Sequence, residues 1–151
     1  MKKLGLVLVA GTVISLVTAG FALGMARGTY KVAATLSAKA EVPAPVGAAG
    51  AKGTFSGKYV ENKNGSAVLT WALNFSRLTG PGTAAHIHMG KTGVAGNVIV
   101  PLCTPCKSGM TGKVTIAKTV ITALEGGKAY VNVHTTKNAG GEIRGQVKVT
   151  G

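Results

Sequence analysis

The sequence contains no aspartate, and its only acidic residues are four glutamates among 151 residues that include 17 lysines and arginines. A chain without aspartate cannot form a Ser-His-Asp triad, and no serine sits in a recognisable nucleophile turn. No second glutamate is placed to pair with Glu142 for general acid–base catalysis. The sequence therefore argues against a hydrolase.

Cysteine is also scarce, since Cys103 and Cys106 are the only two. The residue directly after Cys106 is Lys107 and not histidine, which excludes covalent haem attachment. Their spacing is that of a thiol–disulfide motif, but a redox catalyst places its first cysteine at a helix N-terminus, where the thiolate is stabilised. Here the pair follows a predicted strand and precedes the turn 107–109. We predict a disulfide that tightens a loop; a copper(I) site made by two reduced thiols is the minor alternative.

Aromatic residues are few and are not interleaved with the lysines as stacking platforms, so nucleic acid is not an expected partner. The formal net charge is +13, or +11 once the predicted signal segment with Lys2 and Lys3 is removed. Such a charge suits an anionic cell-surface polymer, a protein partner or anionic lipid. A lysine-covered solvated surface explains the same charge without any partner.

The one long apolar run extends from Leu4 to about Leu23 and follows two lysines. Small residues then permit cleavage after Ala22 or Ala26, so residues 1–26 are predicted to be an export signal. An uncleaved membrane anchor is the alternative, and only in that case would the membrane be a partner. Either way, the protein is expected to work outside the cytoplasm, in the periplasm or secreted.

Residues 30–150 alternate polar and apolar side chains between glycine-rich and proline-rich turns, which predicts a single all-β domain. The exception is a short helical segment near 119–125, followed by two glycines. Short strands at regular spacing favour an antiparallel Greek-key sandwich or barrel of about eight strands. The predicted strands are 30–41, 53–61, 66–78, 84–89, 97–102, 112–118, 129–135 and 142–150.

All three histidines fall in two segments, 85–100 and 129–149. His86 and His88 are two residues apart, so in a strand they share a face at a separation of about 7 Å. His134 shares a face with Tyr130 and Asn132 in the alternating run that precedes it. If the two strands are neighbours, the three imidazoles converge and can bind copper or zinc. The alternative is that the histidines only hydrogen-bond to loop backbone.

Other residues near these segments are candidates for supporting roles. Glu142 could orient a ligand histidine, as carboxylates beside metal sites often do, with Arg144 and Asn132 within reach. Alternatively, Glu142 pairs with Arg144 or accepts backbone N–H bonds and fixes the glycine turn. Met89 and Met110 are possible soft ligands, although Met89 joins His88 only if the strand bulges there.

Three stretches together resemble the CHRD family, a domain first described in chordin and also found in exported bacterial proteins. They are AEVPAP near residue 41, AHIHMGKTGVAGNVIVPL in the middle and YVNVHTTKNAGGEIRGQV near the end, and the resemblance covers about residues 32–149. It implies an extracellular, all-β module. In chordin the domain sits in a protein that binds growth factors, a role that does not transfer with the fold alone.

The His-x-His strand, the later strand histidine and NAGGEIRGQV are also similar to copper/zinc superoxide dismutase. This resemblance implies that His86, His88 and His134 are copper ligands. The sequence departs from that family because it has no bridging histidine, no aspartate for the zinc site and no cysteine in its last strand. Dismutase activity is therefore not expected.

The sequence leaves three hypotheses. The first is an exported, non-catalytic binding module with a three-histidine copper or zinc site. The second is an adhesion or matrix module that binds an anionic polymer or a protein through its basic surface, with structural histidines. The third and weakest is a dismutase-like or thiol-redox enzyme.

Overall fold

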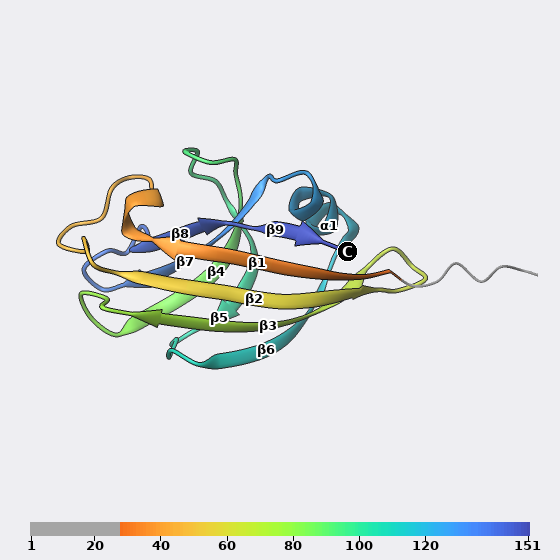
Figure 1. Cartoon of the computed structure of the whole chain (residues 1–151), viewed down its shortest axis with the longest axis horizontal. Helices are drawn as coiled ribbons and strands as arrows, with labels where there is room; N and C mark the ends of the chain where they lie inside the picture. The colour runs from red at the N-terminus through yellow and green to blue at the C-terminus, as the bar shows by residue number, and fades with distance from the viewer. Residues whose placement is uncertain (1–27) are drawn as a thin grey trace, which may run out of the picture.

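A computed structural model describes residues 28–151 as one antiparallel sheet of nine strands (Figure 1); the predicted signal segment, 1–26, lies outside the described residues. The strands are β1 Thr29–Ser37, β2 Lys52–Glu61, β3 Ala67–Ser76, β4 Gly82–Met89, β5 Val98–Cys103, β6 Met110–Ile116, β7 Ala129–Thr135, β8 Ile143–Gln146 and β9 Lys148–Thr150. A 3-10 turn, η1 (Ala38–Ala40), and a helix, α1 (Lys118–Glu125), complete the described elements. The predicted all-β fold is confirmed.

The strands follow the order β5-β4-β7-β8-β1-β2-β3-β6, with β9 beside β1. The sheet curls until β5 and β6, at its two ends, approach each other, so it is nearly a closed barrel. β3 pairs with β6 rather than with β4, the next strand in the chain, and this is the connection of a Greek key. The topology places β4, β7 and β8 together, although β4 is far from the other two in sequence.

The inner face of the sheet forms the core because apolar residues recur at every second position. In β3, Leu69, Trp71 and Leu73 are buried, while Thr70 and Asn74 are exposed. The helix α1 contributes a buried set to the same core, namely Val120, Ile121, Ala123 and Leu124. Within residues 28–151, no helix combines the length and the apolar character needed to cross a lipid bilayer.

The last predicted strand, 142–150, is divided in the structure. β8 lies between β7 and β1 and pairs with both, whereas β9 pairs with β1, so the pairing with β7 ends at Val147. The N–H of Val147 donates to the carbonyl of Ala129, and Lys148 then lies opposite Ala33 of β1. Alternation continues through this change, which is why the sequence predicted one strand where two exist.

The loop between β5 and β6 connects the two ends of the sheet. Cys103 and Cys106 are joined by a disulfide, as predicted. The N–H of Cys106 donates to the carbonyl of Gly82 in β4, at 3.0 Å, and the N–H of Gly109 donates to Leu73 in β3, at 2.9 Å. This disulfide loop therefore bridges the gap that pairing between β5 and β6 leaves open.

Candidate metal centre

The outer face of β4, β7 and β8 is polar and largely covered. Residues that alternate with the core positions project there: His86 lies opposite Asn132, and His88 lies opposite Tyr130. On the next strand, Arg144 lies opposite Asn132. Asn132 and Arg144 are only 1% and 2% exposed, which is unusual for an outer face. Loops at both ends of the strands cover these side chains.

The three histidines converge on this face, since one ring nitrogen from each lies within 4.8 Å of the other two. Nδ1 of His86 is 3.1 Å from Nε2 of His134. The ring centre of His88 is 5.6 Å from that of His86 and 6.0 Å from that of His134. His88 and His134 are buried, and His86 is partly exposed. The neighbouring strands β4 and β7 thus bring together His86, His88 and His134, the three ligands predicted from the sequence.

Backbone carbonyls determine the tautomer of two of these rings. Nδ1 of His88 is 2.8 Å from the carbonyl oxygen of Gly96, and Nδ1 of His134 is 2.9 Å from that of Ala139. A carbonyl only accepts, so each Nδ1 bears the hydrogen and each Nε2 presents a lone pair. Nε2 of His88 is buried and has no hydrogen-bond partner among the described residues, 28–151. These are the two nitrogens that could coordinate a metal ion.

The surroundings favour neutral imidazoles. Burial lowers the pKa of His86, and the neighbouring imidazoles of His134 and His88 lower it further. Burial also lowers the pKa of His134, outweighing the opposite effect of its N–H bond to Ala139, and His88 adds to the decrease. A neutral imidazole is the form that binds metal ions. At neutral pH, protons therefore compete weakly for these two rings.

Arg144 fixes the loop of residues 90–97 that passes over His88. Its Nη2 donates to the carbonyls of Lys91 and Val94, at 2.8 and 2.9 Å. The guanidinium also lies 3.3 Å from the ring centre of Tyr130, whose ring stacks on His88 from the adjoining strand. Gly96 belongs to this loop, and a Cβ there would collide with the carbonyl of Met89. Only glycine permits the approach that brings the Gly96 carbonyl to His88.

Glu142 fixes the other loop, residues 135–141. Its carboxylate is fully buried and accepts hydrogen bonds of 2.5 to 2.9 Å from Thr79, Thr135 and Asn138. Burial alone would raise its pKa, but these donors outweigh burial and lower it. The same loop contains Ala139, whose carbonyl accepts from His134. The alternative in which Glu142 pairs with Arg144 is not what the structure shows, because each bonds to a different loop.

Glu41 lies on this face and was not identified from the sequence as a site residue. It is 4% exposed, with Oε1 accepting from the N–H of Val42 at 3.0 Å. A Cβ on Gly141 would collide with the carboxylate of Glu41 and would also lie close to the side-chain amide of Asn132. Burial raises the pKa of Glu41, although the Val42 N–H, Arg144 and Asn132 all act to lower it. The sequence feature that could have identified Glu41 was the motif AEVPAP, which contains one of only four acidic residues.

The structure does not bring the proposed sulfur ligands to the histidines. Met89 alternates with His88 along β4 and is 39% exposed. Met110 packs against the core on the inner side of the sheet, and its sulfur accepts from the N–H of Lys107 at 3.2 Å. The candidate ligand set is therefore made only of imidazoles.

These observations define an antiparallel Greek-key barrel module with a covered histidine cluster on its outer face. The family profile of the CHRD domain matches residues 32–147, and the chain belongs to the CHRD domain family. The resemblance expected from the sequence is confirmed. No curated protein and no solved structure was found to match the chain.

Proposed function

We propose that this CHRD domain is an exported, non-catalytic binding module that binds one copper or zinc ion through His86, His88 and His134. The convergence of three histidines supports this function. Imidazole suits both metals, and three imidazoles form a common ligand set for zinc.

The separation of the nitrogens supports the proposal. Two nitrogen ligands at about 2.0 to 2.1 Å from one ion would be about 2.9 to 3.4 Å apart, for angles between 90° and the tetrahedral angle. Nδ1 of His86 and Nε2 of His134 are 3.1 Å apart. A hydrogen bond between the two rings gives a similar distance, so this pair alone does not distinguish the two arrangements.

The observation that best supports the proposal is the Nε2 of His88, which has no hydrogen-bond partner among residues 28–151. This nitrogen is buried, and its tautomer leaves a lone pair pointing away from Gly96. A buried polar atom without a partner costs about 1 to 3 kcal/mol. A hydrogen bond between His86 and His134 leaves Nε2 of His88 without a partner, whereas a metal ion shared by the three rings would accept its lone pair.

Titration of the purified protein with Zn(II) and Cu(II) tests this function. We expect one site per chain, and replacing both His86 and His134 by alanine should lower its affinity by more than about 100-fold, beyond the effect of losing an outer partner. Thr136→Ala, an exposed change in the loop that follows His134, is the matched control and should leave the affinity unchanged. Because the pKa of His86 and of His134 is lowered, Zn(II) binding should persist below pH 6.5, where a free histidine peptide loses its metal. Binding no tighter than that of such a peptide would contradict the proposal.

Export is the second part of this function and depends on residues 1–26. We expect the protein recovered from outside the cytoplasm to begin at Arg27 or at Leu23, according to whether the segment is cleaved after Ala26 or after Ala22. N-terminal sequencing or measurement of the intact mass identifies the first residue. Recovery of the whole chain only from the cytoplasmic fraction would contradict export.

A further inference from the structure

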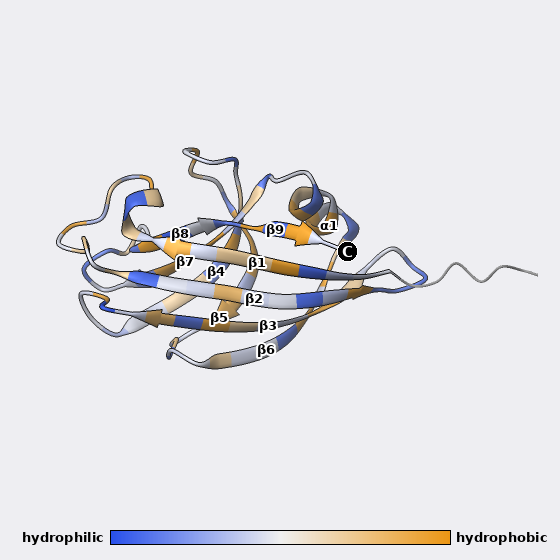
Figure 2. Ribbon diagram, in the orientation of Figure 1, coloured by the Kyte–Doolittle hydropathy of each residue, from blue (hydrophilic) through white to orange (hydrophobic). Residues whose placement is uncertain are grey.

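The outer face of β9, β1, β2, β3 and β6 has a narrow composition. Every exposed residue of these five strands is lysine, threonine, serine, asparagine or alanine. We call this surface the lysine face, after its five exposed lysines, Lys31, Lys52, Lys58, Lys113 and Lys148. Hydrophilic segments recur on the front strands of Figure 2, which belong to this surface.

Four of the lysines form a row across the strands. Lys31 lies directly opposite Lys58, while Thr70 lies between Lys58 and Lys113. Lys148 lies opposite Ala33, which is two residues along β1 from Lys31 and on the same face. With strands about 4.8 Å apart, the row spans about 19 Å from β9 to β6. Like charges directly opposite each other destabilise a sheet, so the pairing of Lys31 with Lys58 is not explained by folding.

No carboxylate lies among the exposed residues of this face. Glu41 and Glu142 are buried beside the histidines, and Glu125 accepts from the hydroxyl of Tyr59 at the helix α1. Glu61, the last residue of β2, is partly buried. The lysines are therefore not neutralised by neighbouring acids, and they produce a positive field over the whole face.

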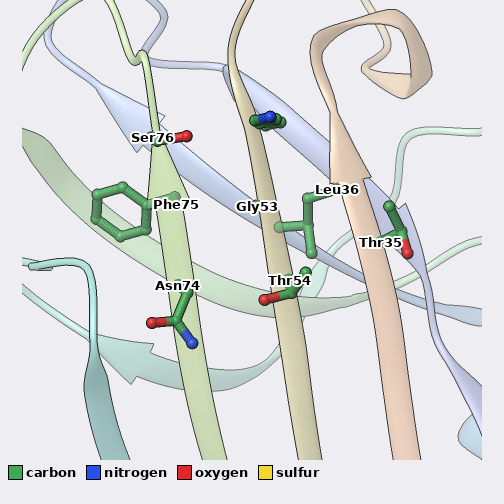
Figure 3. Close-up of a pocket in the computed structure, with 8 residues that line it drawn as sticks. Thr35, Leu36, Gly53, Thr54, Asn74, Phe75 and Ser76 are labelled. Carbon is green, nitrogen blue, oxygen red and sulfur yellow. The ribbon is translucent and has the colours of Figure 1, made fainter.

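The surface between the lysines is hollowed. Three adjoining open depressions, of about 410, 500 and 480 Å³, lie along it; the first and second share Thr35 and Thr54, and the second and third share Ser56. In the first, Thr35, Thr54 and Asn74 lie side by side on three strands (Figure 3). Their hydroxyl and amide groups can both donate and accept hydrogen bonds. The face thus combines cations with shallow depressions in which hydroxyl and amide groups lie within a mainly apolar surface.

We propose that the lysine face binds a linear acidic polysaccharide, with lysines pairing to its carboxylates and the threonine, serine and asparagine side chains bonding to its hydroxyls. A lipid surface fits less well because the face exposes no large apolar side chain for insertion. Nucleic acid fits less well because the face exposes neither an aromatic ring for stacking nor an arginine. The proposal is independent of the metal centre, which lies on β4 and β7.

Binding to polygalacturonate, measured by calorimetry at several salt concentrations, tests the proposal. The variant Lys31→Glu with Lys58→Glu should bind at least about tenfold more weakly, because two attractions become repulsions. The control Lys63→Glu with Lys118→Glu makes the same change of net charge on exposed lysines outside the face and should remain within about threefold of the wild type. Zn(II) binding should be unchanged in both variants, which separates this test from that of the metal centre.

Equal weakening in the two variants would overturn the proposal, since the binding would then depend on net charge alone. Tighter binding to anionic phospholipid vesicles or to DNA than to polygalacturonate would overturn it in favour of those partners, as would absence of binding at low salt. Dextran, a neutral polysaccharide, should not bind. If the double glutamate variant does not fold, Lys31→Gln with Lys58→Gln replaces it, with the control altered in the same way.

Discussion

Glu142 and Arg144 are buried charges only two residues apart, and each bonds to a different loop. Glu142 fixes residues 135–141, whose Ala139 carbonyl accepts from His134. Arg144 fixes residues 90–97, whose Gly96 carbonyl accepts from His88. At the residue scale, Glu142 and Arg144 therefore hold the two loops whose carbonyls set the tautomers of His88 and His134, without bonding to either ring. Such indirect partners tune metal sites as strongly as many direct contacts do.

Glu142→Gln should lower the free energy of unfolding by about 3 kcal/mol at pH 7, because an amide nitrogen would face groups that donate to the carboxylate. The folded-state pKa of Glu142 is lowered, so its contribution is complete above the ordinary value of 4.5 and decreases as pH falls below it. Denaturant titrations of wild type and variant should therefore converge below pH 4.5. Glu61→Gln is the control and should cost little. A difference that stays constant down to pH 3 would contradict this role.

At this scale the sequence predicted which residues share a face but not what they bond to. The spacing of His86 and His88, and the position of His134 after an alternating run, depend only on the period of a strand. The partners of Nδ1 are carbonyls of Gly96 and Ala139, and their positions depend on loop conformations that no periodicity describes. Glu41 was not predicted for a related reason: it follows the 3-10 turn η1, so the period of a strand does not place its side chain on this face.

At the scale of elements, the loop 90–97 is a separable unit whose position depends on few side chains. Arg144 bonds to two of its carbonyls, and Gln146 donates to a third, that of Gly90, at 2.9 Å. Val94 in this loop is 55% exposed, so the loop does not pack into the core through that side chain. Its order therefore comes from hydrogen bonds to β8 more than from apolar burial.

Arg144→Met keeps most of the buried volume but removes both hydrogen bonds to the loop. We expect cleavage by trypsin after Lys91 to become at least about tenfold faster, because local opening costs less free energy when its fixing bonds are lost. Global stability should fall by about 1 to 3 kcal/mol, because the charged donor of two hydrogen bonds and its contact with Tyr130 are lost. Cleavage after Lys63, in the turn between β2 and β3, is the internal control. Equal rates after Lys91 in the two proteins would show that other contacts order the loop.

The elements themselves were largely predictable, and their pairing was not. Alternation located the strands, and the two glycines after Glu125 located the end of α1. The break at Val147 was not predictable, because Val147 and Val149 keep the same alternation while the pairing with β7 ends and the pairing with β1 continues. Periodicity reports which way a side chain points; it does not report which strand lies beside it.

At the scale of the whole molecule, the histidine cluster and the lysine face occupy different surfaces of one barrel. Two of the four glutamates are buried at the histidine face, and the lysine face exposes none. The net charge of +13 was visible in the sequence, but the alignment of five lysines on one face depends on the order in which those strands pair. The two proposed binding surfaces can therefore act at the same time on different ligands.

Closure of this barrel depends on the disulfide loop, because backbone bonds from Cys106 and Gly109 reach β4 and β3 from a single short segment. Replacing both cysteines by alanine should lower the free energy of unfolding by about 2 kcal/mol, the loop-entropy value for a ring of this size. Reduction with dithiothreitol should destabilise the wild type by a similar amount and leave the variant unaffected. Zn(II) affinity should change by less than about threefold, because the loop lies outside the segments that fix the histidines. A large loss of metal affinity in the variant would show instead that the position of β4 depends on the disulfide.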